Sequence, residues 1–337
     1  MHDGVAAAGT TMSRRDVVAI GGSVGAVPAM LELVSALPPD FPAAVLAVLH
    51  IGANESQMPA LLSNRGRLRA VHPVDGQAPE PGVVHVAPPD RHMVVDGGRV
   101  RLVHGPKEHH TRPAIDPLFR SAAAGLGERV IGVVLSGGMD DGTAGLQAIK
   151  ACGGLAVVQH PSTAIEPSMP MSAITYAQVD YVRPLGELAP LLAGLAGQPV
   201  AATRAIPDRL VHELANFHGT RPQMENLHAI GHPSTFTCPE CDGVLWRLAD
   251  TQPPRYRCHT GHAYSLRSLD ASQRKSTEDA IWAALRALQE REQLLRRLAQ
   301  SSAPGEATGI HADWAREADA TAAHASRLKE IIEAGGT

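Results

Sequence analysis

The sequence is poor in aromatic residues, which make up 3% of its 337 positions. A core with so few rings has to be built mainly from Val, Leu, Ile and Ala. Hydrophobic residues do reach 44%, against 19% charged residues, a balance typical of a folded, soluble protein. Basic residues are not in excess, since the formal net charge is -4. The sequence therefore lacks the electrostatic footprint of a nucleic-acid-binding protein.

Long apolar runs are also missing. No stretch approaches the roughly 20 residues of a membrane span. Residues 1–15 lack the apolar segment of a secretory signal and read as a flexible tail. Four cysteines are too few for a disulfide framework in a chain of this length. We therefore expect a cytoplasmic protein with no membrane insertion and no nucleic-acid partner.

Short, nearly continuous apolar runs alternate with longer helix-compatible segments from residue 16 onward. Such runs are expected of strands buried on both faces of a parallel sheet. The alternation predicts an α/β domain over residues 16–197, with a doubly wound, mostly parallel sheet. The expected strands are residues 16–20, 43–49, 129–135 and 154–158, and the expected helices are residues 28–36, 58–64, 116–124 and 143–151. Residues 92–95 and 99–103 read as a β-hairpin at an edge of this sheet.

Beyond residue 197 the alternation stops. Residues 198–234 are rich in Pro, His and short polar segments and are predicted to be a linker with a short helix at 208–217. A compact, zinc-ribbon-like module follows at 235–266. Residues 267–334 carry two apolar helical stripes separated by Pro304-Gly305. These stripes predict a C-terminal helical hairpin. The apolar faces of its helices either pack against each other or mediate a homodimer.

A glycine-rich turn follows the first expected strand. Gly21-Gly22-Ser23-Val24-Gly25 fits the pattern G-x-S-x-G. In that pattern the glycines lift a serine hydroxyl clear of the sheet, and the start of the next helix offers N–H groups to an oxyanion. A turn of this kind can also hold a phosphate, and the local sequence does not decide between the two. A serine on the first strand does not fit the α/β-hydrolase fold, so another fold has to host it.

A serine nucleophile needs a base, usually an oriented histidine, and the chain has 17 histidines. In a parallel sheet, residues at the carboxyl ends of the strands converge on one edge. This position selects His50, His160 and the acidic pair Asp140 and Asp141 as partners for Ser23. Position alone leaves His50 and His160 as equal candidates for the base.

The segment from residue 17 to about 194 resembles the catalytic domain of CheB-type chemotaxis methylesterases. The matching pieces are VVAIGGSVGA (17–26), VLHI (48–51), VVHVAPPDRHM (83–93), RPAIDPLFRSAA (112–123), LSGGMDDGTAGLQAIKACGG (135–154) and PSMP (167–170). Enzymes of this family hydrolyse γ-glutamyl methyl esters on chemoreceptors, and many also deamidate receptor glutamines. The resemblance implies a catalytic triad of Ser23, His50 and Asp141, no cofactor for catalysis, and a methyl-accepting, chemoreceptor-like protein as substrate.

The chain departs from the usual family pattern at several points. Val24 stands where the family usually has Thr, and Met139 is displaced by one position in the turn before Asp141. Chemotaxis members also usually carry an N-terminal receiver domain, which the fifteen tail residues are not expected to supply. The alternative interpretation is a regulatory or binding protein with a weak or vestigial esterase site, which recruits a partner through the cysteine module and the helices.

The module at 235–266 has the donor spacing of a structural zinc site. Cys238 and Cys241 lie at one turn, and Cys258 and His262 lie at a second one. Thiolate and imidazole donors split between two turns are typical of tetrahedral zinc. His259 is adjacent to Cys258 and less able to share the ion. A thioredoxin-like redox pair is the alternative, although its βαβ context is missing. Similar segments with a helical tail occur in stand-alone CheB-like proteins.

Overall fold

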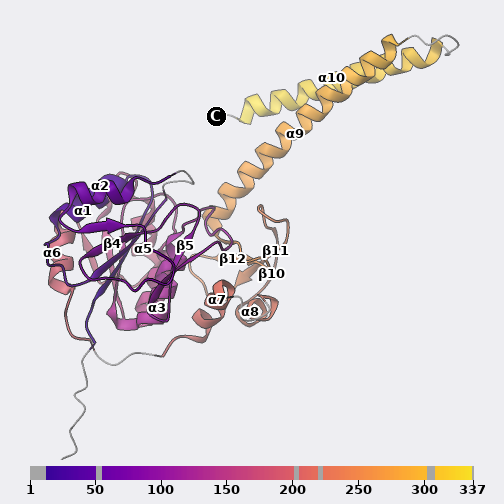
Figure 1. Cartoon of the computed structure of the whole chain (residues 1–337). Coiled ribbons are helices and arrows are strands. Elements are labelled where there is room, and N and C mark those ends of the chain that lie inside the picture. The colour runs from indigo at the N-terminus through magenta and orange to yellow at the C-terminus, as the bar shows by residue number, and fades with distance from the viewer. Residues whose placement is uncertain (1–12, 51–54, 201–204, 219–222, 302–307, 336–337) are drawn as a thin grey trace, which may run out of the picture. The chain divides into compact units, whose positions relative to one another are not determined.

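The computed structural model describes residues 13–50, 55–200, 205–218, 223–301 and 308–335. The chain divides into two compact units, Met1–Leu269 and Asp270–Thr337 (Figure 1). Several predicted features lie outside the described residues: most of the tail at 1–15, Ile51 of the VLHI motif, parts of the linker at 198–234, and the Pro304-Gly305 turn.

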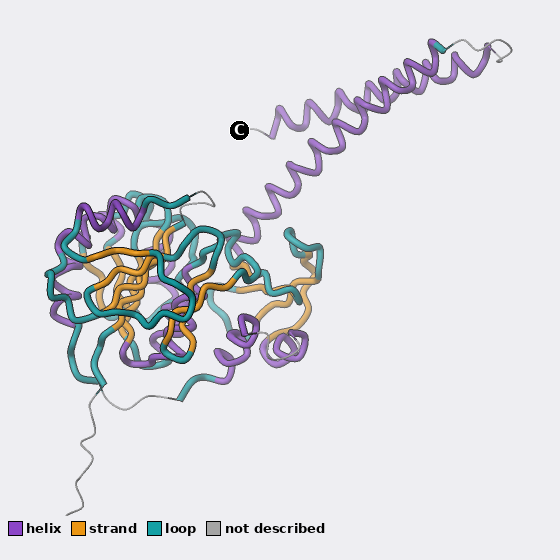
Figure 2. The backbone as a smooth tube through the Cα atoms, in the orientation of Figure 1, coloured by secondary structure: helices purple, strands orange, loops and turns teal. Residues whose placement is uncertain are grey.

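The first unit is built around a seven-stranded sheet with the order β3-β4-β2-β1-β7-β8-β9. Figure 2 draws the strands in orange. Every pairing in this sheet is parallel. All residues of β1 and β2 are buried, as expected of central strands that are covered on both faces. The predicted mostly parallel α/β architecture is confirmed. The strands are β1 (Val17–Gly22), β2 (Ala44–Leu49), β3 (Arg69–Val71), β4 (Val83–Val86), β7 (Val130–Val134), β8 (Leu155–Gln159) and β9 (Tyr181–Arg183).

Helices cover both faces of the sheet through two separate hydrophobic cores. One core joins the sheet to α1, α2 and α6, and the other joins it to α3, α4 and α5. Because β1 lies between β2 and β7, the winding of the chain reverses at β1. Such a reversal opens a crevice at the carboxyl ends of the strands. The helices are α1 (Ala26–Ala36), α2 (Met58–Arg65), α3 (Ile115–Leu126), α4 (Thr143–Ala151), α5 (Ser168–Tyr176) and α6 (Leu185–Leu195), with short 3-10 turns η1 (Gly127–Arg129) and η2 (Pro161–Thr163).

The predicted hairpin is present but occupies a different place. Strands β5 (His92–Asp96) and β6 (Arg99–Val103) form a two-stranded sheet of their own and pair with neither edge of the main sheet. Met93 lies in the same core as α3, and the Val95 N–H donates to Ser121 Oγ of α3 at 2.9 Å. Packing on a helix, which strand alternation does not reveal, therefore holds the hairpin away from the sheet edge.

The segment predicted as a linker contains α7 (Asp208–His218) and α8 (Gln223–Ile230). Leu210 and Leu214 of α7 are buried in the core that contains α3. An antiparallel four-stranded sheet follows, with its strands in sequence order. Its strands are β10 (Gly231–Thr237), β11 (Val244–Leu248), β12 (Arg255–Cys258) and β13 (Ala263–Ser265).

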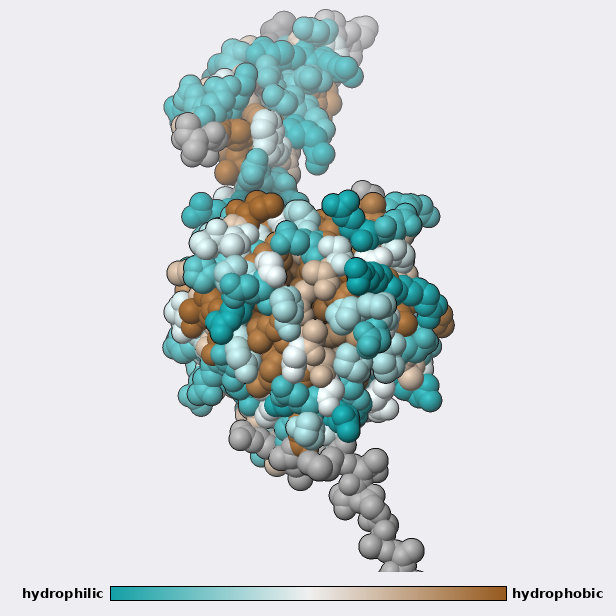
Figure 3. Space-filling view, turned by 90° about the vertical axis from the view of Figure 1, so that its left-hand side faces the viewer, coloured by the Kyte–Doolittle hydropathy of each residue, from teal (hydrophilic) through white to brown (hydrophobic). Residues whose placement is uncertain are grey.

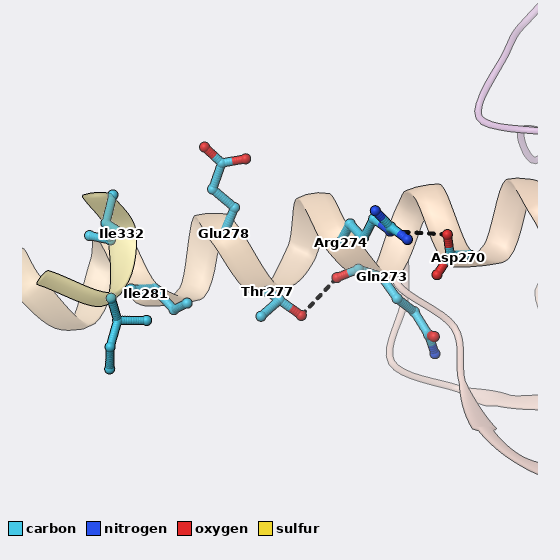
Figure 4. A pocket seen from close by; sticks show the side chains of 8 residues that line it. Asp270, Gln273, Arg274, Thr277, Glu278, Ile281 and Ile332 are labelled. Carbon is cyan, nitrogen blue, oxygen red and sulfur yellow. Dashed lines mark hydrogen bonds and ion pairs between the residues drawn. The ribbon is translucent and has the colours of Figure 1, made fainter. Parts of the chain in front are cut away.

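The second unit is the predicted helical pair. It consists of α9 (Leu266–Gln300), whose first residues belong to the first unit, and α10 (Thr308–Gly335). The face of this pair seen in the upper part of Figure 3 is mainly hydrophilic. A groove of about 630 Å³ lies between the helices, and Ile281 of α9 and Ile332 of α10 are among the residues that line it (Figure 4). Within the described ranges, none of the helices combines the length and apolarity needed to cross a membrane.

Candidate active site

The carboxyl ends of β1, β2 and β7 meet where the winding of the sheet reverses. Ser23 follows β1, His50 follows β2, and Asp141 lies in the turn between β7 and α4. The His50 N–H donates to the Gly22 carbonyl at 3.1 Å, and the Ser23 N–H donates to the Ser136 carbonyl at 2.9 Å. These backbone bonds hold the three strand ends together. A crevice in this position is where doubly wound proteins bind their ligands.

The turn that carries Ser23 depends on glycine. Gly25 has a φ of 77°, in the left-handed region that side chains disfavour. A Cβ at Gly25 would also lie 2.5 Å from Ile165 Cβ. On the facing turn, a Cβ at Gly137 would lie 3.1 Å from Ser23 Cβ. The missing side chain of Gly137 therefore leaves space beside the serine, which is partly exposed.

His50 and Asp141 form a hydrogen-bonded pair. Nε2 of His50 lies 2.9 Å from Oδ2 of Asp141. Their side chains are 13% and 2% exposed, respectively, so the pair is largely shielded from water. Oγ1 of Thr111 lies 3.3 Å from the same ring nitrogen.

The Asp141 carboxylate is fixed at the start of α3. Oδ2 accepts the Ile115 N–H at 2.7 Å, and Oδ1 accepts the Asp116 N–H at 2.9 Å. A helix N-terminus stabilises an anion in this position. Burial alone would raise the pKa of Asp141, but His109, His50 and the Ile115 N–H outweigh burial and lower the pKa to about 2. Asp141 is therefore ionised at neutral pH.

His109 is a second histidine beside Asp141. Its Nε2 lies 3.2 Å from Asp116 Oδ2 and 3.8 Å from Asp141 Oδ1, and its Nδ1 lies 3.8 Å from Asp140 Oδ1. Burial alone would lower the pKa of His109, but these three carboxylates raise it to about 9. Since both ring nitrogens face carboxylates, His109 is an imidazolium at neutral pH. Strand-end reasoning missed this residue because it follows no strand of the main sheet.

His109, Asp116 and Asp141 are close enough together to be considered as a metal site. Their oxygens are already engaged, however. Oδ1 of Asp116 accepts the N–H groups of Gly142 and Gly145 at 3.0 and 2.7 Å, and Oδ2 faces His109. The carboxylates of this cluster thus serve as hydrogen-bond acceptors and partners of a cation, not as spare metal ligands.

The other residues that strand-end position selected lie elsewhere. His160 is exposed, and its Nδ1 lies 2.7 Å from Ser162 Oγ at the start of η2. Asp140 accepts a hydrogen bond from Ser265 Oγ at 2.6 Å. The structure thus brings Asp141 to His50 and directs the other two candidates to different partners.

Two N–H groups of the turn that faces Ser23 are already used within the protein. The Ser136 N–H donates to Oε1 of the buried Gln159 at 2.8 Å. The Gly137 N–H donates to the Glu166 carbonyl at 2.9 Å. The N–H groups of Val24 and Gly138 have no acceptor within the part of the chain that the structure describes. Val24 and Gly138 therefore keep N–H groups that could bind an oxyanion, as do Gly25 and Met139, whose N–H groups likewise have no acceptor among the described residues.

A separate cluster lies in the cysteine module. The donor atoms of Cys238, Cys241, Cys258 and His262 all lie within 4.8 Å of one another. The two Sγ atoms of Cys241 and Cys258 are 3.6 Å apart, and His262 Nδ1 is 3.7 Å from Cys238 Sγ and 3.5 Å from Cys258 Sγ. Donors of a tetrahedral zinc ion would be roughly 3.5–3.8 Å apart, given the usual zinc–ligand bond lengths. The spacing therefore fits zinc, and the exposed His259 lies outside the cluster.

Known proteins resemble the first half of this chain. A family model described as CheB methylesterase matches residues 18–192 and ends before the cysteine module. A protein of Anaeromyxobacter dehalogenans named protein-glutamate methylesterase/protein-glutamine glutaminase 2 is 36% identical over 183 residues, which cover 54% of each chain. A Leptospira interrogans protein, provisionally named for the same two activities, is 35% identical over 182 residues, which cover 53% of this chain and 94% of that one.

A solved structure shows the same fold. The crystal structure of the Thermotoga maritima CheB methylesterase catalytic domain is similar with a TM-score of 0.52 and 29% sequence identity. The match covers 55% of this chain and 100% of the Thermotoga chain. The likeness thus extends over a whole catalytic domain and leaves the rest of this chain unmatched.

Proposed function

Because the chain belongs to the CheB methylesterase family, we propose that it is a serine-type hydrolase that removes methyl esters from glutamyl side chains of a chemoreceptor-like protein. The observation that carries this proposal is the His50–Asp141 pair, 2.9 Å apart, at the strand ends where Ser23 leaves β1. The names of the relatives include protein-glutamine glutaminase as well. The same chemistry on a glutamine amide would release ammonia in place of methanol.

In the proposed reaction, His50 takes the proton of Ser23 Oγ while this oxygen attacks the ester carbonyl. Because Nε2 of His50 faces Asp141, Nδ1 is the ring nitrogen that acts as the base. The proton then passes to the methoxy oxygen, methanol leaves, and the glutamyl group stays on Ser23. Water, activated by the same nitrogen, hydrolyses this acyl-enzyme. Asp141 orients the ring and stabilises its charged form.

The proposed oxyanion donors are the N–H groups of Val24 and Gly138. An N–H of the residue after the nucleophile is a common donor in serine hydrolases. The Val24 N–H lies just before the start of α1, where the helix dipole adds to the stabilisation of negative charge. The role of both N–H groups depends on backbone atoms, so the unusual Val24 side chain does not remove it.

A fluorophosphonate probe tests the nucleophile directly. The proposal expects a single labelled serine, identified as Ser23 by mass spectrometry of peptides, and no label in Ser23→Ala. The matched control is Ser35→Ala, at the other end of α1, which should be labelled like the wild type. A folded wild-type protein that takes no label would contradict the proposal. It would favour the alternative of a binding protein with a vestigial site.

The cysteine module is proposed to hold one structural zinc ion through Cys238, Cys241, Cys258 and His262. The donor spacing supports this assignment, and a module this small usually needs a metal to stabilise it. Elemental analysis should find about one zinc per chain. Cys238→Ser should lose that zinc, whereas Cys152→Ser, a buried cysteine at the end of α4, should keep it. Stoichiometric zinc in Cys238→Ser would count against the ligand set.

For the helical pair, homodimerisation remains the proposed role. Trp282, Leu294 and Ile331 expose apolar surface on α9 and α10, and a second helical pair could cover it. Sedimentation equilibrium should give a dimer for the full chain and a larger monomer fraction for Trp282→Glu. A wild-type chain that is monomeric at all concentrations would exclude this role.

A further inference from the structure

The sheet of the cysteine module pairs with a segment that leads into the esterase site. The backbone N–H of His109 donates to the Ala263 carbonyl at 2.9 Å, and the Ala263 N–H donates to the Lys107 carbonyl at 3.3 Å. Glu108 and Ala263 form a parallel bridge. Residues 107–111 are called the connecting segment below. Its residues 107–109 pair with the outer edge of β13 and link the module to the main domain.

Buried ion pairs reinforce this pairing. Glu108 accepts hydrogen bonds from Arg120 of α3 at 2.7 Å and from Arg257 of β12 at 2.8 Å, and all three side chains are at most 2% exposed. Burial alone would raise the pKa of Glu108, but the two guanidinium groups lower it. Arg257 also donates to the Gly261 carbonyl at 2.9 Å, in the turn that carries the last two proposed zinc ligands. One buried side chain therefore joins the zinc turn to the connecting segment.

The connecting segment is strained. His109 and His110 have φ values of 51° and 65°, in the left-handed region that residues other than glycine rarely adopt. Two such residues in succession persist only where surrounding contacts hold them. In this structure, the contacts include the backbone bonds to Ala263 and the edge-on packing of the His110 ring against Tyr264. The module thus helps to hold a backbone shape that the segment would not adopt alone.

This strained segment touches the proposed triad. Thr111 Oγ1 lies 3.3 Å from His50 Nε2, and His109 Nε2 lies 3.8 Å from Asp141 Oδ1. Both members of the His50–Asp141 pair therefore have a neighbour on the connecting segment. A displacement of the segment would move the Thr111 hydroxyl away from His50 and the charged His109 ring away from Asp141.

A second connection runs through β13 itself. Ser265 Oγ donates to Asp140 Oδ1 at 2.6 Å, and Asp140 precedes Asp141 in the turn after β7. Ser265 Oγ also accepts the Ser268 N–H at 3.2 Å, so Ser265 caps the start of α9. The side chains of Ser265, Asp140 and Ser268 are all buried.

The geometry points to the cysteine module as a positioning element of the esterase site. Zinc bound at Cys238, Cys241, Cys258 and His262 fixes the module turns, and the connecting segment then holds His50 and Asp141 in the arrangement for hydrolysis. This inference rests on the proposed function and adds a regulatory condition to it. Hydrolysis should require the loaded module, although the family match ends before the module begins.

Removal of the metal from the full chain tests the coupling. A chelator is added until zinc release is complete, and hydrogen exchange of peptides covering residues 107–111 is followed together with the rate of fluorophosphonate labelling. The metal-free chain should exchange faster at 107–111 and label at least about tenfold more slowly, since misplacement by about 1 Å is enough for such losses. Peptides covering β7 serve as the internal control, and added zinc should restore both readouts.

A pair of variants separates coupling from general damage to the module. Ser265→Ala removes the hydroxyl that reaches Asp140, whereas Ser234→Ala removes a hydroxyl of β10 that bonds only within the four-stranded sheet, to the Leu245 carbonyl at 2.7 Å and the Phe236 N–H at 3.2 Å. Both variants should keep about one zinc per chain. Ser265→Ala should label about threefold or more slowly, and Ser234→Ala should label at the wild-type rate.

The inference is overturned if the metal-free chain keeps its protection at 107–111 and labels at the rate of the zinc-loaded chain. Equal labelling rates for Ser265→Ala and Ser234→Ala would also contradict it. A zinc-loaded wild type that takes no label at Ser23 would instead refute the proposed function. In that case, hydrogen exchange at 107–111 still decides whether the module positions the segment.

Discussion

The Asp141 carboxylate connects the proposed base to the backbone of α3. One oxygen faces both His50 Nε2 and the Ile115 N–H, and the other accepts the Asp116 N–H. A carboxylate with these bonds has little freedom to turn. It therefore fixes the histidine ring with respect to the helix instead of merely supplying charge nearby.

Asp141→Asn should retain the fold and lose most of the activity. An amide NH2 group cannot accept hydrogen bonds, and the neutral side chain no longer stabilises a charged His50. We expect a fall in kcat of about 10³–10⁴-fold, similar to the effect of this change in other serine triads. The matched control is Asp180→Asn, a carboxylate that accepts the Ala156 N–H away from the site. It should keep its activity within about twofold, and equal losses in the two variants would argue against the assigned role.

The pKa of His109 predicts how stability depends on pH. Its folded-state pKa of about 9 lies above the unfolded value of about 6.5. The stabilisation by the protonated ring is therefore complete below about pH 6.5 and is lost as the pH rises through 9. Urea unfolding should show that the free energy of unfolding falls over this window more steeply in the wild type than in His109→Gln, by at most about 1.4 kcal/mol per pH unit. His160→Gln, which replaces an exposed histidine, should follow the wild type.

Parallel pH curves for wild type and His109→Gln would show that His109 is not the titrating group. The partners that favour its charge are Asp116, Asp140 and Asp141, and the nearby cation is Arg120, 3.9 Å from Asp116. This arrangement of charges around His109 was not predictable from the sequence. His109 comes within reach of Asp140 and Asp141 only when the turn after β7 folds against the start of α3.

At the scale of elements, the turn from β1 to α1 leaves no room for a side chain at Gly25. Gly25→Ala should destabilise the protein in two ways. Alanine disfavours the left-handed φ of this position, and its Cβ would collide with Ile165. Gly98→Ala is the matched control, since Gly98 has a φ of 73° and nothing within 4 Å of an added Cβ. We expect the control to lose about 1–2 kcal/mol of stability and Gly25→Ala to lose more, together with Ser23 labelling. Equal losses of stability, measured by urea unfolding, would show that space is not limiting at Gly25.

The central elements were predictable because their apolar runs are long and buried on both faces. The expected strand at 43–49 corresponds to β2 (Ala44–Leu49), and the expected helix at 143–151 corresponds to α4 (Thr143–Ala151). The three-residue edge strands β3 and β9 were missed, because so short a segment carries no usable periodicity. The hairpin was recognised from its turn, but its position depends on a hydrogen bond to Ser121 that no local pattern contains.

At the scale of the whole molecule, the parallel sheet gathers residues that are far apart in the sequence. His50 and Asp141 are 91 positions apart, and the strand order alone places their strand ends near Ser23. This part of the site was accessible from the sequence, and the family resemblance then selected His50 over His160. The contact between Arg257 and Glu108, 149 positions apart, was not accessible, since two charged residues at that distance give no signal of being buried together.

Methanol release tests most directly whether Ser23 hydrolyses a glutamyl methyl ester. The zinc-loaded full chain is mixed with methylated chemoreceptor helices, and methanol is quantified over time for the wild type and for Ser23→Ala. We expect steady release by the wild type and a loss of at least about 10³-fold in the variant. Equal methanol release by wild type and Ser23→Ala would contradict this role of Ser23.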